Sequence, residues 1–321
     1  MEPFVPRRGL RSPHLQTLAA AFLPRPNGLP APERRLFEVE PQARVLAFCN
    51  WQAERERALT VVIVHGLEGS SESRYVIGTA NKAWAAGMNV VRMNVRNCGG
   101  SEALAPTLYH SGLSSDVGAV VRALISEDRM PRIALAGFSM GGNTVLKLAG
   151  EWGNEAPAQL RAVAAVCPGM DLATSAVALH EWRNRIYEWN FLWSLKRSVR
   201  RKVRLFPNVC DPGKLRGLRS LRDFDDAITA PHWGFAGAED YYARASSSPL
   251  VGRIAVPTLV IHADDDPFIH ITPQTRARLR ANSNIRFLET EHGGHCGFLA
   301  DPDGYDGRWA ERQIVEFLRG F

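Results

Sequence analysis

The chain has 321 residues, of which 45% are hydrophobic and 22% charged, and its net charge at neutral pH is +6. This composition is typical of a folded globular protein and excludes the fibrous and disordered classes. Much of the positive excess lies in one block, and no zinc-finger, basic-zipper or RNA-binding signature accompanies it. We therefore expect no nucleic-acid partner. The block comprises Lys196, Arg197, Arg200, Arg201, Lys202 and Arg204.

The N-terminal residues 1–35 are rich in proline and arginine. Ser12 and Pro13 are placed as the N-cap and the first residue of a short helix. The apolar stretch from Leu18 to Leu23 is too short for a secretory signal and stops at Pro24. We interpret residues 1–35 as an N-terminal arm that contains this helix.

Short runs rich in β-branched residues recur after the arm, separated by segments with the apolar spacing of helices. This alternation predicts an α/β fold in which helices cover both faces of a mostly parallel sheet. We assign residues 36–169 and 250–321 to this core. The expected strands are 45–48, 60–64, 89–95, 133–136, 162–166, 258–261 and 285–288.

The strand pattern lapses in residues 170–249, which we interpret as a helical lid inserted into the core. Four large apolar residues share one helical face, and a second apolar stripe lies opposite the basic residues. The favoured interpretation packs these helices on the core and leaves a cationic face in solvent. Weak contact with a membrane surface through the lid is the alternative. The first face holds Trp182, Ile186, Trp189 and Trp193, and the second Leu195, Val199, Val203 and Phe206.

Residues 137–141 read Gly-Phe-Ser-Met-Gly, a G-x-S-x-G pattern. The pattern follows the strand expected at 133–136 and opens a run with helical spacing, which is the strand, turn and helix of a nucleophile elbow. Glycines permit the strained backbone that presents a serine hydroxyl above the sheet. We predict that Ser139 is a nucleophile.

A serine hydroxyl needs a base, and the base needs a group that orients it. The loop after strand 258–261 contains the aspartates 264–266, and the loop after strand 285–288 contains His292 and His295. Both loops lie at carboxyl ends of strands, where parallel sheets place their sites. The residues do not rank the three aspartates, whereas Gly294 and Gly297 favour His295 over His292.

No metal or cofactor is expected, although His262 and His270 flank the three aspartates. Such groups near a sheet edge usually satisfy loop hydrogen bonds rather than bind an ion. The five cysteines are scattered without a C-x-x-C spacing, which predicts neither a disulfide framework nor a structural zinc site. A reducing compartment fits them, and no apolar run approaches the length of a membrane span, so we expect a cytoplasmic protein.

An acyl-transfer site also needs N–H donors for the oxyanion of the tetrahedral intermediate. The first expected donor is the backbone N–H of Met140, directly after the nucleophile. The second should come from the glycine-rich loop 65–71 after strand 60–64, where the N–H of Leu67 is the best candidate. The loop lacks the phosphate-binding patterns G-K-[ST] and G-x-G-x-x-G.

With these motifs the sequence resembles the α/β-hydrolase superfamily and, more narrowly, its AB hydrolase 4 family of esterase- and lipase-like proteins. The resemblance spans nearly the whole chain and implies an α/β-hydrolase fold with a lid insertion. It also implies Ser139 as nucleophile, Asp266 as orienting carboxylate and His295 as general base. Further segments that carry it are S-P-H-L-Q-T at 12–17, R-N-C-G-G-S at 96–101, H-S-G at 110–112 and F-D-D at 224–226. The family commonly has glycine where Asn97 stands.

We therefore expect a carboxylic ester hydrolase that forms an acyl-enzyme on short- to medium-chain acyl or lipid-like esters. Its partner is a small-molecule ester. The alternative is an acyltransferase, or ester synthase, that passes the same acyl group to an alcohol. A binding protein on the same scaffold is disfavoured because all the residue types of the triad are present.

Overall fold

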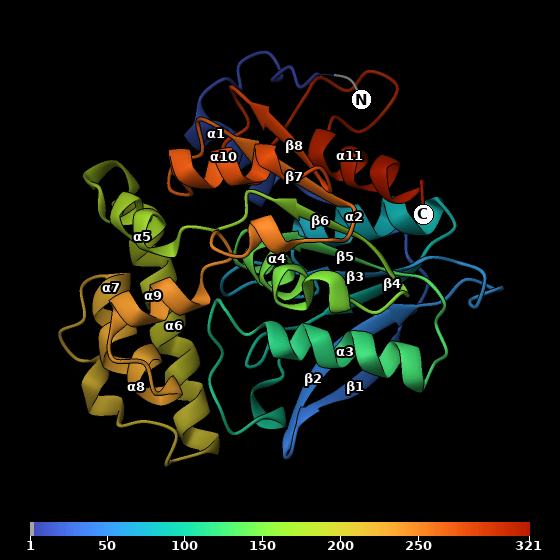
Figure 1. The fold of residues 1–321 in the computed structure, drawn as a ribbon. Helices are drawn as coiled ribbons and strands as arrows, with labels where there is room; N and C mark the ends of the chain where they lie inside the picture. Colours follow the sequence, from blue (N-terminus) through green and yellow to red (C-terminus); the bar gives the residue numbers. More distant parts are fainter. Residues whose placement is uncertain (1–2) are drawn as a thin grey trace.

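The computed structural model describes residues 3–321 and is built around one eight-stranded sheet, in the order β1-β2-β4-β3-β5-β6-β7-β8 (Figure 1). β2 pairs antiparallel with β1 and β4, and the pairs from β4 to β8 are parallel. The predicted mostly parallel α/β fold is confirmed. The strands are β1 Glu33–Glu40, β2 Ala43–Asn50, β3 Thr60–Val64, β4 Asn89–Met93, β5 Ile133–Phe138, β6 Leu160–Val166, β7 Thr258–Ala263 and β8 Ile285–Thr290.

All seven predicted strands are present, but strand β1 was not predicted and begins inside the segment assigned to the arm. β1 is an edge strand with the sequence E-R-R-L-F-E-V-E, in which only Phe37 is buried. Charged residues protect such an edge from pairing with other chains. Because of these charges, the strand also lacks the apolar run by which the other strands are predicted.

Helices cover both faces of the sheet, and alternate residues of the central strand β3 show the two layers. Val62 and Val64 pack in one apolar cluster with α3, α4 and α10, whereas Val61 and Ile63 pack in another with α2 and α11. This division follows from the two-residue period of a strand. The core helices are α2 Arg74–Ala85, α3 Ser114–Ser126, α4 Met140–Trp152, α10 Pro273–Ala281 and α11 Trp309–Leu318.

Two further groups of helices lie outside this core. The arm contains α1 Pro13–Phe22, the helix expected there, and the segment 170–249, which we continue to call the lid, forms a helical group beside the sheet (Figure 1). No helix within residues 3–321 is long and apolar enough to cross a bilayer. The lid helices are α5 Leu172–His180, α6 Arg185–Leu205, α7 Leu221–Phe224, the π-helical turn η5 Asp225–Thr229, α8 Ala230–Trp233 and α9 Ala238–Ala245.

Short 3₁₀ turns complete the chain: η1 Glu102–Leu104, η2 Gly153–Glu155, η3 Trp182–Asn184, η4 Pro212–Leu215 and η6 Val251–Arg253.

Helix α6 and the turn η3 before it are oriented differently from the favoured interpretation, because their tryptophan face points to solvent. Trp182, Ile186, Trp189 and Trp193 are 78%, 68%, 71% and 52% exposed. The expectation that this face packs on the core is wrong, whereas the stripe at Leu195 and Val199 is buried as expected. Helical spacing shows which residues share a face, but the partners that the folded chain offers decide which face is buried.

Candidate active site

The G-x-S-x-G turn joins β5 to α4 and holds Ser139 in a left-handed conformation with φ of 53°. The two glycines are required by close packing. A Cβ at Gly137 would overlap the carbonyl of Gly141, and a Cβ at Gly141 would overlap the carbonyl of Val64. The elbow therefore places Ser139 directly before the N-terminus of α4, where developing negative charge is stabilised.

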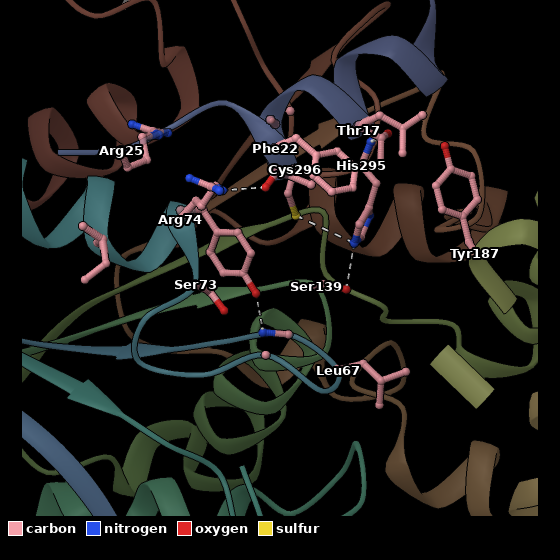
Figure 2. A pocket seen from close by; sticks show the side chains of 18 of the residues that line it. Thr17, Phe22, Arg25, Leu67, Ser73, Arg74, Ser139, Tyr187, His295 and Cys296 are labelled. Atoms are coloured by element: carbon pink, nitrogen blue, oxygen red, sulfur yellow. Dashed lines mark hydrogen bonds between the residues drawn. The ribbon is translucent and has the colours of Figure 1, made fainter. Parts of the chain in front are cut away.

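Three side chains remote in the sequence meet at this elbow. His295 Nε2 lies 2.9 Å from Ser139 Oγ, although 156 residues separate them, and His295 Nδ1 lies 2.8 Å from Asp266 Oδ2. Figure 2 shows the imidazole directed at the serine hydroxyl. Ser139, His295 and Asp266 follow β5, β8 and β7, so the site lies at the carboxyl ends of three parallel strands.

The neighbouring aspartates and His292 have other partners. Asp265 accepts the backbone N–H of Gly294 at 2.8 Å and lies 3.3 Å from the His292 ring, and Asp264 pairs with Arg276 at 2.9 Å. His292 therefore contacts the neighbouring aspartate loop through Asp265 rather than the nucleophile. The geometry brings together the set that the resemblance implies and leaves the remaining candidates outside it.

Burial and charge act in opposite directions on the imidazole and its carboxylate. Burial lowers the pKa of His295, but the Asp266 carboxylate outweighs burial, and the pKa stands well above its ordinary value. Burial raises the pKa of Asp266, but the imidazole and the N–H of Ile269 outweigh it, and the pKa is lowered. Asp266 thus stays ionised and makes His295 a stronger base.

The loop 65–71 lies against the nucleophile, because a Cβ at Gly66 would stand 3.1 Å from the Cβ of Ser139. Within residues 3–321 the N–H of Leu67 donates to no protein acceptor. Met140 is the first residue of α4, where a backbone N–H has no acceptor within the helix. Both N–H groups predicted for the oxyanion thus remain free to bind a substrate oxygen.

His65 braces this loop. Its Nε2 accepts the N–H of Val95 at 3.1 Å, and its Nδ1 lies 2.7 Å from the carbonyl oxygen of Gly66. Complete burial lowers the pKa of His65 to about 4, so the ring is neutral at physiological pH. A neutral ring with both nitrogens engaged holds the loop and exchanges no proton with substrate.

Glu68 fastens the same loop to the lid, a role that the sequence did not reveal. Its backbone is left-handed, with φ of 53°. Its carboxylate accepts hydrogen bonds from the hydroxyls of Ser194 and Ser198 on α6, each at 2.7 Å, and from Tyr109 at 2.8 Å. The position of Leu67 therefore depends on the lid helix.

Helix α1 positions the loop that carries His295. Thr17 Oγ1 accepts the backbone N–H of His295 at 2.9 Å, and the amide of Gln16 both accepts from and donates to the backbone of Leu299. A Cβ at Gly294 would overlap the carbonyl of Pro13. The S-P-H-L-Q-T segment thus holds the histidine loop in place, although it is far from that loop in the sequence.

Asn97 adopts the conformation that glycine would supply at that position. Its φ is 66°, in the left-handed region that asparagine tolerates better than other side chains do. The preceding Arg96 forms a buried ion pair with Asp116 at 2.6 Å. Val95 and Cys98 pack against Met140 of the elbow. The departure from the family pattern therefore leaves this loop in place.

Two cavities meet at Ser139. The larger has a volume of about 670 Å³ and is lined by α1 and the His295 loop, including Leu18, Phe22 and Tyr187. The smaller, of about 110 Å³, extends beneath the lid. Its apolar lining includes Leu179, Phe191, Leu195, Leu221 and Ile269. The lid thus supplies apolar walls through Phe191 and Leu195, whereas the tryptophans of α6 turn away.

Comparison with known proteins agrees with this architecture. Residues 60–302 match the model of a family described as having the alpha/beta hydrolase fold. The protein YheT of Escherichia coli, named for a proposed esterase activity, is 33% identical over 98% of this chain and 92% of its own length. The yeast "Medium-chain fatty acid ethyl ester synthase/esterase 2" is 29% identical over 88% of this chain and 67% of its own.

More distant relatives agree. Human "Phospholipase ABHD3" is 28% identical over 81% of this chain and 63% of its own length. Among solved structures, an esterase from Pyrococcus furiosus covers 90% of this chain and 92% of its own with a TM-score of 0.59, and at 15% identity it supports the fold alone. The family match and the 33% identity to YheT together show that the chain belongs to the α/β-hydrolase fold family, with the character of an esterase or lipase.

Proposed function

We propose that this protein hydrolyses carboxylic esters through an acyl-enzyme formed on Ser139. The observation that carries the proposal is the continuous pair of hydrogen bonds from Asp266 through His295 to Ser139. An imidazole held between a carboxylate and an alcohol is the arrangement that activates a serine for attack on a carbonyl carbon.

The reaction proceeds in two halves. His295 Nε2 takes the proton of Ser139 as Oγ attacks the carbonyl carbon, and the N–H groups of Leu67 and Met140 hold the oxyanion. Collapse of this intermediate releases the alcohol, which receives the proton from His295. A water then attacks the acyl-enzyme, with His295 again as base, and the acid leaves as Ser139 is regenerated.

The small cavity sets the acyl length in this proposal. Its volume is about 110 Å³. The larger cavity, at about 670 Å³, is several times bigger, so the smaller cavity suits the shorter, acyl portion of the ester. The alcohol portion then lies in the larger cavity. Short acyl chains therefore fit without rearrangement of the lid, and longer ones require movement of the lid helices.

Replacing Leu179 with alanine should extend the acyl preference, because Leu179 lines the small cavity and a smaller side chain enlarges it. In a series of p-nitrophenyl esters from acetate to dodecanoate, we expect the maximum of kcat/KM to move by about two carbons toward longer chains. Leu18→Ala is the matched control, because Leu18 lines only the larger cavity. If the chain-length profile of Leu179→Ala is unchanged, the acyl chain does not bind in the small cavity.

Acyl transfer remains the alternative outcome of the same acyl-enzyme. The name of the yeast relative, an ethyl ester synthase and esterase, favours testing ethanol as acceptor. The ratio of free acid to ethyl ester, measured by chromatography during turnover in increasing ethanol, separates the two. If ethanol captures the acyl group far more often than the molar ratio of ethanol to water predicts, this protein is an ester synthase.

We further propose that the solvent-facing side of α6 contacts an anionic lipid surface. The exposed tryptophan face continues along the helix, at the same spacing, into the exposed Arg197, Arg200 and Arg204. Tryptophan suits the membrane interface, and arginine suits anionic headgroups. α1 adjoins this surface, since His14 Nδ1 lies 2.9 Å from Tyr187 Oη, and its exposed Phe22 lines the larger cavity.

Vesicle sedimentation tests this contact. Vesicles of phosphatidylcholine with phosphatidylglycerol should bind the protein at least tenfold better than phosphatidylcholine alone, and salt should weaken binding. Trp189→Ala combined with Trp193→Ala should remove most binding while hydrolysis of a water-soluble short ester persists. Leu36→Ala, on the edge strand β1, is the control. A dimer that dissociates in the double variant, without vesicle binding, would instead make this face a contact between copies.

A further inference from the structure

Two cysteines stand beside the base of the proposed triad. The Sγ atoms of Cys167 and Cys296 and a ring nitrogen of His295 all lie within 4.8 Å of one another. Cys296 Sγ is 3.9 Å from His295 Nε2, the nitrogen that faces Ser139 (Figure 2). Cys167 directly follows β6, so the fold brings together thiols that are far apart in the sequence. Both thiols are free.

The spacing of these atoms approaches that of a tetrahedral zinc site. With Zn–S bonds of about 2.3 Å and Zn–N bonds of about 2.0 Å, ligand atoms stand about 3.5 to 3.8 Å apart. The Nε2 to Sγ separation of 3.9 Å is therefore close to what an ion would impose. Two thiolates and one imidazole are ligands that zinc and other thiophilic ions prefer.

The surroundings already orient these ligands. Asp266 engages His295 Nδ1 at 2.8 Å, which directs Nε2 outward in the manner of a carboxylate–histidine–zinc arrangement. The backbone N–H of Cys296 points at Cys167 Sγ at 3.4 Å, a contact that stabilises a thiolate. Cys296 and His295 also line the larger cavity, so an ion can reach two of the three ligands from it, with space for a fourth ligand on that side.

We propose that Cys167, Cys296 and His295 form an inhibitory binding site for a thiophilic divalent cation, with Zn²⁺ as the representative ion. Binding releases the two thiol protons and places the Nε2 lone pair on the metal. Because that lone pair is the one that accepts the Ser139 proton, metal binding and acylation exclude one another. The inhibitory effect rests on the proposed function, whereas the binding itself does not.

The test follows ester hydrolysis and metal binding separately. Zn²⁺ at micromolar concentration should reduce the rate of p-nitrophenyl butyrate hydrolysis at least tenfold, a chelator should restore it, and Mg²⁺ should have no effect. Cys167→Ser, which keeps the size of the side chain but supplies a poor zinc ligand, should need at least tenfold more Zn²⁺. Cys210→Ser, a thiol in the lid, should behave as the unaltered protein.

Calorimetry with Zn²⁺ and the Ser139→Ala protein gives a readout that needs no catalysis. We expect one ion per chain, with proton release that depends on the buffer, and at least tenfold weaker binding when Cys167→Ser is added. If Zn²⁺ inhibits the unaltered protein and Cys167→Ser equally, or if calorimetry detects no binding, the proposed site is wrong. If the unaltered protein binds one Zn²⁺ but hydrolyses no ester, the proposed function is wrong and the proposed metal site is not.

Discussion

Ser139→Ala is expected to lower kcat for ester hydrolysis by at least about 10⁵-fold. Alanine has no oxygen that can form the acyl-enzyme, and His295 2.9 Å away is left without a nucleophile to deprotonate. The fold should remain intact, because the elbow is held by its glycines and by the Ser139 N–H, which donates to the carbonyl of Val166 at 2.9 Å. Initial rates and the thermal unfolding midpoint measure the two effects.

Ser126→Ala is the matched control, because the Ser126 hydroxyl donates within its own helix, to the carbonyl of Arg122. A fluorophosphonate should label the unaltered protein and Ser126→Ala to the same extent but leave Ser139→Ala unlabelled. Hydrolysis by Ser139→Ala at a rate close to that of the unaltered protein would remove Ser139 from the mechanism.

Asp266→Asn is expected to lower kcat by about 10⁴-fold at neutral pH, because the amide neither stabilises the imidazolium nor selects the required tautomer. Asp265→Asn tests the choice within the cluster. It should cost far less, since Asp265 contacts Gly294 and His292 rather than His295. If Asp265→Asn is the more damaging change, the orienting carboxylate has been assigned to the wrong aspartate.

The pH profile adds an independent measure of the same pair. A base with a raised pKa is protonated, and therefore unavailable, below that pKa, so kcat/KM should rise with pH through a value above the ordinary histidine range. The Asp266→Asn protein has no charge beside His295 to favour the imidazolium, so its residual activity should rise at lower pH than in the unaltered protein. An identical midpoint in both proteins would mean that Asp266 does not tune His295.

Much of the fold could be predicted because its signals are local. A strand such as Thr60–Val64 is buried on both faces and reads as a continuous apolar run. The edge strand β1 lacked that signal because its charges face solvent. Orientation was harder still: the spacing on α6 grouped Trp189 with Trp193 correctly, but the face that met the core was the one with Leu192 and Val199.

In the site, too, local motifs could be predicted from the sequence, whereas contacts between distant segments could not. Contacts such as Glu68 to Ser194 and Thr17 to the His295 backbone join segments more than 100 residues apart, and no local pattern marks their partners. The resemblance named the S-P-H-L-Q-T segment without a role. The role follows from the packing of α1 on the histidine loop, where a side chain at Gly294 would collide with Pro13.

Local features of the sequence were enough to predict the alternation of strands and helices, the elbow at Ser139 and the loops that carry the acid and the base. These depend on backbone preferences and apolar periodicity over a few neighbouring residues. Tertiary packing brings Asp266 rather than its two neighbours to His295, as the family resemblance implies, and it alone shows which face of α6 meets solvent and that Cys167 lies beside Cys296. Each of those outcomes depends on which distant surfaces are buried together, because the free energy of burial belongs to the pair of surfaces and not to either segment alone.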